Sequence, residues 1–454
     1  MFSVDDVRHA FGAELIGEHA GAADAFAGVT NDSRVARPGE LFVALETEKR
    51  DGHDFIADAV ARGVAGVVVQ NEEILLPEGV WAFLVRDTKH AIGELARYWR
   101  ARFPRLRAIV VAGNVGKTTT KELTAAVLSK RFNVLKSPAN FNDEVGLAMT
   151  LFQLDEGHER AVLEVGMFEA GEIRRLCEIA RPSVAVVLNV GPTHMERLGS
   201  IEAIAAAKAE AIEALTEDGC AVLNADDPEV AAMATKTRAR VLTFGVDQHA
   251  TVRATEIKGR GLSGVDFQLA CGGRGLKGHS PLPGERLVPN ALAAVAVALA
   301  EGMSLEEAAH ALAQADVPLR LQAKAAVNGA TVLDDAYNAS PASMLAALGV
   351  LAEMPGRRLA LLGDMLELGE AEAAGHRQVG EAAAKVVDAL FTVGPRGVQI
   401  AAAARAAGAA FVRHFDSKEE AAAELRRLLG PGDVLLVKAS HGLALETVVE
   451  ELAV

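Results

Sequence analysis

The chain has 454 residues, half of them hydrophobic and 24% charged, with a formal net charge of −15 at pH 7. A chain of this length is expected to form two to four domains with buried cores, and its acidic balance argues against a nucleic-acid backbone as its partner. It has neither an apolar run long enough to span a bilayer nor a signal-peptide pattern, and its three cysteines lack metal-binding spacing, so we expect a cytoplasmic protein with reduced thiols.

Residues 1–105 are predicted to form a small α/β domain. Short apolar runs between polar turns favour strands, and the stretch Thr88–Phe103 favours a helix that ends before Pro104. The strands are expected at Leu41–Ala44, Gly66–Val69 and Ala82–Val85.

Residues 106–316 are predicted to form a central, doubly wound and mainly parallel sheet. Apolar strands alternate here with helical patterns, which is typical of a parallel sheet covered on both faces. Glycine-rich segments from Gly259 to Gly284 indicate added antiparallel strands, and a helix is expected at Asn290–Glu301. The parallel strands are expected at Ala108–Ala112, Ala161–Val165, Val184–Val190, Ala221–Asn224 and Val241–Phe244.

Residues 317–454 alternate again and are predicted to form a Rossmann-like α/β domain. The alanine excess of their helical segments reflects helix propensity rather than disorder. Strands are expected at Thr331–Asp334, Leu359–Leu362, Leu390–Val393 and Val434–Val437. The predicted fold class is therefore α/β, in three domains.

The strongest functional signal follows the strand at Ala108–Ala112. A glycine turn between a strand and a helix aims backbone N–H groups and a helix N-terminus at one point, which suits phosphate. We expect Lys117 to reach the terminal phosphates of a bound ligand and Thr118 to hold Mg²⁺. The spacing is shorter than in the usual P-loop, and an ordinary βα turn is the alternative. The residues concerned are Gly113, Asn114, Val115, Gly116, Lys117, Thr118 and Thr119.

Polar residues collect where the central strands are expected to end. Glu164 closes one apolar run, and Asn189 and His194 follow another. Ligands bind at this edge of open α/β sheets. A carboxylate and an imidazole there would complete the ligand shell of a phosphate-bound Mg²⁺ or of a second metal, although each residue alone is more often a surface carboxylate or a turn cap.

Lys208 is predicted to lie on the apolar face of a helix at Ile201–Leu215, four residues from both Ile204 and Ile212. The helix pattern alone favours a lysine that snorkels past small alanines to water. The alternative is a buried amine with a lowered pKa, which would take up CO₂ to form a carbamate, an anionic oxygen ligand for Mg²⁺. The glutamates of this helix are expected to point elsewhere: Glu202, Glu210 and Glu213.

Motifs spread along the chain occur together in one known family. They are Thr30–Arg34, Asp51–Phe55, Glu164–Gly166, Gly171–Ile173, Asn189–His194, Ala207–Glu210, Asn290–Ala294, Asp335–Met344 and Leu362–Glu370. With the glycine turn, they resemble the Mur ligases, ATP-dependent amide-bond-forming enzymes of peptidoglycan precursor synthesis. The last two motifs are the most specific, because they resemble the branch that adds a dipeptide rather than a single amino acid.

The resemblance implies a reaction and its partners. ATP, with Mg²⁺, would convert the carboxylate of UDP-N-acetylmuramoyl-tripeptide to an acyl phosphate, which the amine of D-alanyl-D-alanine then attacks. The first domain would bind the UDP-sugar and the central domain ATP, while the third would close on ATP and bind the dipeptide. We expect a cytoplasmic monomer with no nucleic-acid partner and no membrane insertion.

The resemblance also implies roles for single residues. Lys117, Glu164, His194 and carbamylated Lys208 would be catalytic, and Thr118, Glu164, His194 and Lys208 would hold metal. Gly113 to Thr119 would bind the nucleotide together with Asn290, which packs against adenine, and with Arg320 and Asp335. The residues facing the other substrates would be Ser33, Arg34, Asn140, Asn142, Tyr337 and Asn338.

The chain departs from the family's usual pattern at several places, including Asp143, Ala148 and Lys438–His441. Ala112, Asn114 and Val115 alter the phosphate loop, and Arg286-Leu287 replaces a His-Asn pair before Asn290, so the effect on ATP affinity stays open. The alternatives are a sister ligase that adds a diamino acid, a folylpolyglutamate synthetase and a non-catalytic nucleotide-binding sensor. The third peptide residue is left open between diaminopimelate, lysine and ornithine.

Overall fold

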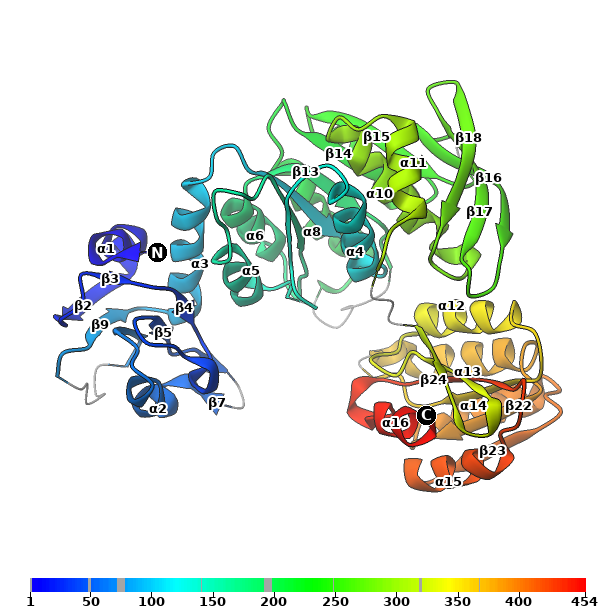
Figure 1. The fold of residues 1–454 in the computed structure, drawn as a ribbon. Coiled ribbons are helices and arrows are strands. Elements are labelled where there is room, and N and C mark those ends of the chain that lie inside the picture. The colour runs from blue at the N-terminus through cyan, green and yellow to red at the C-terminus, as the bar shows by residue number, and fades with distance from the viewer. Residues whose placement is uncertain are drawn as a thin grey trace.

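A computed structural model describes residues 2–47, 50–71, 78–139, 141–191, 198–247, 249–317, 321–366 and 368–454. Three main sheets succeed one another along the chain, each with helices packed against it, as Figure 1 shows. The predicted α/β fold in three domains is thereby confirmed. We keep the boundaries after residues 105 and 316 as a proposal.

The first sheet has five strands in the order β2-β9-β8-β5-β4, and only β2 runs antiparallel to its neighbour. Helices α1 and α3 bury one face of it and α2 the other. The strands are β2 (Leu15–His19), β4 (Val29–Thr30), β5 (Leu41–Val43), β8 (Gly66–Val69) and β9 (Trp81–Val85), and the helices are α1 (Val4–Phe11), α2 (Ile56–Ala61) and α3 (Thr88–Ala101). Two short antiparallel pairs lie beside this sheet in the sequence: β1 (Phe2–Ser3) pairs with β3 (Ala25–Phe26), and β6 (Glu46–Thr47) pairs with β7 (Arg50–Asp51).

The central sheet has nine strands in the order β11-β12-β10-β13-β14-β15-β16-β17-β18. The strands from β11 to β16 are parallel, and β17 and β18 extend the sheet as an antiparallel meander. The strands are β10 (Arg107–Ala112), β11 (Val134–Lys136), β12 (Arg160–Glu164), β13 (Pro182–Val187), β14 (Cys220–Asn224), β15 (Arg240–Gly245), β16 (Val252–Gly259), β17 (Val265–Cys271) and β18 (Arg274–Ser280).

Helices cover both faces of the parallel part of this sheet. Alternate residues of β10 enter different cores: Val110 packs with α5, α6 and α8, whereas Ile109 and Val111 pack with α4, α10 and α11. This alternation is why the strands read as continuous apolar runs in the sequence. The helices are α4 (Lys117–Leu128), α5 (Glu144–Leu151), α6 (Glu172–Ala180), α8 (Ile201–Glu213), α9 (Pro228–Ala232), α10 (Val288–Ala300) and α11 (Leu305–Ala313).

The third sheet has six strands in the order β19-β20-β24-β21-β22-β23, and only β19 is antiparallel. Helices α12, α13 and α14 cover one face, and α15 and α16 cover the other. The strands are β19 (Gln322–Ala325), β20 (Thr331–Asp334), β21 (Arg358–Leu362), β22 (Ala389–Val393), β23 (Val412–Phe415) and β24 (Val434–Lys438), and the helices are α12 (Pro341–Ala352), α13 (Glu372–Ala383), α14 (Gly397–Ala406), α15 (Lys418–Leu428) and α16 (Glu446–Leu452).

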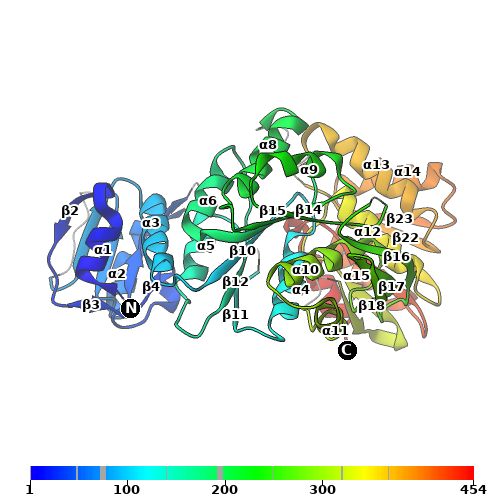
Figure 2. The same cartoon turned by 90° about the horizontal axis from the view of Figure 1, so that it is seen from above.

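The three units lie in a row, with the central sheet in the middle (Figure 2). Helix α3 of the first unit packs on α5 and α6 of the central unit. At the other end, α12 of the third unit meets the turn at residues 285–287 after the antiparallel strands (Figure 1). The third unit therefore docks on the far end of the central sheet, away from α5 and α6.

Most expected elements are present, with one correction at an end that matters for the site. The strand expected at Val184–Val190 ends at Val187, so Asn189 lies in a loop. The helix after the glycine turn begins at Lys117, so Lys117 and Thr118 form its first turn. Among the described residues, no helix is long and apolar enough to cross a membrane.

Candidate active site

The glycine turn lies between β10 and α4, as the sequence predicts. Gly113 has φ 155° and Gly116 has φ 87°, so Gly116 occupies the left-handed region at the start of α4. A Cβ at Gly116 would lie 2.4 Å from Asn290 Nδ2, so only glycine fits there. Because the residue before α4 is a glycine, no side chain caps the first N–H groups of that helix. These groups make the helix start a suitable phosphate site.

The two residues expected at the phosphates and the metal lie next to each other on α4. The Nζ of Lys117 donates to the carbonyls of Gly113 (3.0 Å) and Asn114 (3.4 Å), which folds the side chain over the turn. The hydroxyl of Thr118 donates to Glu164 Oε2 at 2.8 Å. The turn and the end of β12 are therefore directly connected by side chains.

Glu164 is a buried carboxylate held from several sides. Its exposed fraction is 2%, and its Oε1 accepts a hydrogen bond from Asn142 Nδ2 at 2.9 Å. Its backbone N–H donates to the Ser137 hydroxyl at 3.2 Å. A surface carboxylate, the alternative reading of Glu164, is therefore excluded.

Lys208 is buried, so the snorkelling reading favoured by the helix pattern is wrong. The side chain is 4% exposed, and its amine has no hydrogen-bond or ion-pair partner among the described residues. Burial, with a smaller contribution from the positive charge of Lys117, lowers the pKa of Lys208 to about 7. A large share of the amine is therefore neutral near pH 7.

One expectation for the same helix also needs correction. Glu210 points into the protein rather than away from it and is 6% exposed. Its carboxylate accepts hydrogen bonds from the N–H groups of Gly171 (2.8 Å) and Arg174 (3.0 Å). Glu210 therefore stabilises the start of α6 and leaves Lys208 without a counterion from its own helix.

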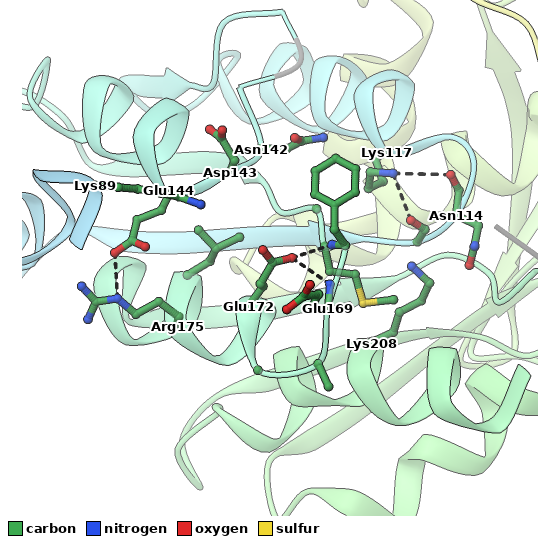
Figure 3. Close-up of a pocket in the computed structure, with 17 residues that line it drawn as sticks. Lys89, Asn114, Lys117, Asn142, Asp143, Glu144, Glu169, Glu172, Arg175 and Lys208 are labelled. Carbon is green, nitrogen blue, oxygen red and sulfur yellow. Dashed lines mark hydrogen bonds and ion pairs between the residues drawn. The ribbon is translucent and has the colours of Figure 1, made fainter. Parts of the chain in front are cut away.

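A cavity of about 480 Å³ connects Lys117 and Lys208 (Figure 3). Lys117 and Lys208 both project towards it from opposite sides, while Arg175 and Glu144 lie at its other end. Arg175 is fastened there, with its Nε 2.8 Å from Glu144 Oε1. The cavity is lined by Lys89, Gly113, Asn114, Lys117, Asn142, Asp143, Glu144, Gly166, Met167, Phe168, Glu169, Ala170, Gly171, Glu172, Arg175, Leu176 and Lys208.

Two asparagines hold the glycine turn in place. Asn189 Oδ1 accepts hydrogen bonds from the N–H groups of Asn114 and Val115, both at 2.9 Å, and its Nδ2 donates to the Val115 carbonyl. The Asn290 amide donates to the Gly116 carbonyl (3.2 Å) and the Thr120 hydroxyl (2.8 Å). In this structure Asn290 thus holds the glycine turn through Gly116 and the first turn of α4 through Thr120. Its contact with adenine stays a prediction.

The altered residues of the turn are accommodated by the chain itself. The side chain of Asn114 exchanges two hydrogen bonds with the backbone of Gly191, at 2.9 and 3.0 Å. Together with Asn189, this contact ties the loop after β13 to the turn. The departures at Asn114 and Val115 therefore do not prevent a P-loop shape.

Other predicted site residues lie outside this cavity. Ser33 is buried in the first unit, and Arg34 is paired with Asp32 at 2.6 Å. In the third unit Asp335 is paired with Lys438 at 2.8 Å, and the ring of Tyr337 lies 5.7 Å from that of His441. Asn338 accepts a hydrogen bond from Lys438 through its carbonyl. Asn140, His194 and Arg320 lie outside the described residues.

Sequence patterns did not identify three of the lining residues: Lys89, Glu144 and Arg175. They come from α3, α5 and α6, three helices whose relative packing is not readable from periodicity. Arg175 also contacts Glu94 Oε1 of α3 at 2.6 Å, which joins the first unit to the central one. The cavity therefore draws on both units.

Comparison with known proteins agrees with this geometry. Residues 25–100 match the Mur ligase family catalytic domain, 111–298 the Mur ligase middle domain and 319–441 the Mur ligase glutamate ligase domain. The UDP-N-acetylmuramoyl-tripeptide–D-alanyl-D-alanine ligase of Escherichia coli K12 is 37% identical over 445 residues, or 96% of each chain. The chain belongs to the Mur ligase family.

Solved structures of that family place it in the MurF branch. MurF from Acinetobacter baumannii has a TM-score of 0.88 and 31% identity over 99% of this chain and 98% of its own. The MurF ligase from Thermotoga maritima, solved in complex with ADP, has a TM-score of 0.82 and 29% identity over 93% and 96% of the two chains. This Mur ligase is therefore an ATP-dependent amide-bond-forming enzyme.

Proposed function

We propose that this Mur ligase joins D-alanyl-D-alanine to UDP-N-acetylmuramoyl-tripeptide through an acyl phosphate, to give the UDP-MurNAc-pentapeptide precursor of peptidoglycan. The observation that carries the proposal is the cavity at the P-loop, where Lys117 and Lys208 face one space beside the Thr118–Glu164 contact. The names of the full-length relatives supply the substrates. The rival readings of a diamino-acid ligase and a non-catalytic sensor are outcomes of the test below.

We assign the nucleotide to the uncapped start of α4. The first N–H groups of the helix face the phosphates there, and the Lys117 ammonium, which now rests on two carbonyls, would turn to the transferred phosphoryl group. Asn189 and Asn290 hold the turn from either side and so keep these donors oriented. Arg320 and Asp335 would complete the nucleotide site from the third domain.

The residues at the turn fit a magnesium ion. Thr118 and Glu164 offer hard oxygen ligands 2.8 Å apart, directly beside the expected phosphates. No group of three His, Cys, Asp or Glu side chains suited to a metal occurs in the described part of the chain, which agrees with an ion held largely by phosphate oxygens and water. When bound, Mg²⁺ would neutralise charge on the transferring phosphoryl group.

We assign Lys208 as the site of a carbamate. Its neutral amine would attack CO₂, so that a C–N bond forms, one proton is released to solvent and the side chain becomes an anion. An unpaired ammonium beside Lys117 has the wrong sign for a metal site. The carbamate would supply the anionic oxygens that Glu210, turned towards α6, does not. His194 is the other proposed ligand there.

The chemistry then requires enclosure. The tripeptide carboxylate attacks the γ-phosphorus and ADP leaves; the dipeptide amine attacks the acyl carbon, and phosphate and a proton leave. Lys117 faces charge that develops in the first step, and the cavity walls keep water from the acyl phosphate. Ser33 and Arg34 would contact the UDP-sugar, Asn140 and Asn142 the peptide, and Tyr337 and Asn338 the dipeptide. We propose a cytoplasmic location and a monomeric state.

A phosphate-release assay with the purified protein tests the function. We expect release to require ATP, UDP-MurNAc-tripeptide and D-alanyl-D-alanine together, with the pentapeptide product identified by mass. Release with a single diamino acid and a UDP-MurNAc-dipeptide would identify a sister ligase, and ATP binding without release under any condition would identify a sensor. Parallel assays with diaminopimelate-, lysine- and ornithine-containing tripeptides would assign the third residue.

A further inference from the structure

Lys121 is a fully buried lysine that the ATP site as described above does not use. It lies on α4 three residues after Thr118 and is 0% exposed. Its Nζ donates to the carbonyls of Ser137 (2.7 Å) and Ala139 (2.8 Å) and lies 2.9 Å from Glu122 Oε1. An ammonium has three N–H donors, and these three acceptors account for all of them. Its charge is therefore buried with every donor satisfied.

The backbone that Lys121 holds belongs to the segment after β11. Ala139 has φ 42°, in the left-handed region that a residue with a Cβ rarely adopts because its Cβ crowds the backbone. The hydrogen bond from Lys121 to the Ala139 carbonyl helps to fix this conformation. Lys121 therefore does more than neutralise Glu122, because it sets the path of a strained turn.

The same segment supports Glu164 at two points. The Ser137 hydroxyl accepts from the Glu164 N–H, and the Asn142 amide donates to Glu164 Oε1 at 2.9 Å. The Asn142 carbonyl also accepts from the N–H of Gly166 at 2.8 Å. Asn142 lines the cavity on the side of α4 (Figure 3). Lys121 thus links the P-loop helix to the residue that orients the Glu164 carboxylate.

We propose that Lys121 is a positioning residue, which fastens the segment after β11 to the P-loop helix so that Asn142, which lines the cavity and is assigned above to the peptide, keeps its orientation. This inference rests on the proposed function. It assigns the residue an effect on the tripeptide substrate rather than on ATP, since the P-loop itself is held by Asn189 and Asn290. A lysine that acts only on stability would affect both substrates equally.

The chain offers a matched control in Lys136. This exposed lysine pairs with the other oxygen of Glu122, so Lys136→Met removes the same charge and a contact to the same carboxylate. It leaves both bonds from Lys121 to the Ser137 and Ala139 carbonyls in place. Lys121→Met removes those bonds with little change in side-chain length. The double variant Lys121→Met/Glu122→Gln also removes the carboxylate that the single change would leave without its buried partner.

The experiment measures kcat, the KM of each substrate, and direct binding of a non-hydrolysable ATP analogue by calorimetry. For Lys121→Met we expect the KM for UDP-MurNAc-tripeptide to rise by about tenfold or more and kcat to fall, with the analogue Kd changed less than about threefold. Lys136→Met should match the wild type. The double variant should show the same selective loss and replaces the single variant if the latter does not fold.

The outcomes separate this inference from the proposed function. Absence of turnover in the wild-type protein would contradict the proposed function itself. With an active wild type, equal losses for ATP and tripeptide, or no loss for either, would overturn the positioning role. Failure of both Lys121 variants to fold would also overturn it, because Lys121 would then be a determinant of stability alone.

Discussion

Two buried lysines, Lys208 on helix α8 of the central unit and Lys438 at the end of strand β24 in the third unit, have opposite electrostatic surroundings. Lys208 in the central unit is 4% exposed, and the charge that acts on it is the like charge of Lys117. Lys438 at the end of β24 is 2% exposed, lies 2.8 Å from Asp335 Oδ2 and donates to the Asn338 carbonyl at 2.7 Å. The sequence shows both simply as lysines near apolar runs.

The difference teaches that burial of a lysine does not by itself indicate function. A buried cation with a carboxylate partner is structurally satisfied, whereas one that faces another cation across a cavity needs an anion from elsewhere. In the central unit we propose that phosphate, CO₂ and the tripeptide carboxylate supply it. In the third unit Asp335 already does. The predictions below test this contrast.

The largest effect is expected for Lys117→Ala. The change removes the positive charge at the transferring phosphoryl group, where an ion is worth several kcal/mol in a water-poor site. We expect kcat to fall by about a thousandfold or more in the phosphate-release assay, with a much smaller effect on thermal unfolding, because the Lys117 side chain lies over the turn at the surface of the cavity. Retention of more than about a tenth of wild-type kcat would show that this turn is not catalytic.

A large loss of kcat without loss of the fold, as for Lys117→Ala, is also expected for Lys208→Ala. Its neighbours on α8 are largely alanines, so the helix should persist, while the proposed carbamate ligand is lost. We expect kcat to fall by about a hundredfold or more, and partial recovery with acetate, which fits the vacated space and restores an anion. Lys208→Arg, which stays cationic, is the control and should not respond to acetate. Acetate rescue of both variants would argue against a specific anion site.

The pKa of Lys208 predicts how activation should depend on pH. Because the pKa is lowered to about 7, the neutral amine that reacts with CO₂ makes up roughly a tenth of the total at pH 6 and nine tenths at pH 8. In protein freed of CO₂ at low pH, recovery of activity on adding bicarbonate should therefore be about tenfold faster at pH 8 than at pH 6, after correction for dissolved CO₂. Equal rates at the two pH values would contradict the assignment.

The lowered pKa of Lys208 also determines how this residue's contribution to the free energy of unfolding changes with pH. The folded-state pKa lies below the ordinary value of 10.5, so the unfolded state binds the extra proton between about pH 7 and 10.5. Without CO₂, the contribution of Lys208 to stability should thus rise with pH across this window and be least favourable below pH 7. Comparison with Lys208→Met in urea unfolding isolates it.

The sequence predicted the elements that have a periodic pattern. It did not predict the surroundings of side chains that pack against other segments of the chain. The strands and the glycine turn follow from periodicity and local chemistry, and the position of Lys208 on the apolar face of α8 offered burial as one of two outcomes. Helix pattern alone nevertheless favoured the wrong outcome, because the walls around Lys208 come from other segments. Glu210 was misjudged for the same reason: its partners are the N–H groups of Gly171 and Arg174 on another helix.

Short edge strands escaped prediction as well. β11, β19 and β23 have three or four residues and mixed burial, so they lack the continuous apolar runs of central strands. Of the site, the P-loop residues and Glu164 were identifiable from one sequence, whereas Lys89, Arg175 and the role of Lys121 depend on which helices meet. Asn114 was recognised as a departure, but its contact with Gly191 was not.

The smallest effect on catalysis, and the largest on stability, is expected for Lys438→Met. Removing one partner of a buried pair leaves Asp335 without its counterion, which typically costs about 3–5 kcal/mol. We expect a clear drop in the denaturant midpoint of the third unit and a smaller loss of kcat per folded molecule than for Lys117→Ala or Lys208→Ala, because Lys438 holds Asp335 and Asn338 rather than the transferred phosphoryl group. Lys438→Met/Asp335→Leu should recover much of the lost stability, because neither charge then remains. A Lys438→Met protein of normal stability but without turnover would show that Lys438, like Lys117 and Lys208, acts in catalysis. The contrast between the two buried lysines would then be wrong.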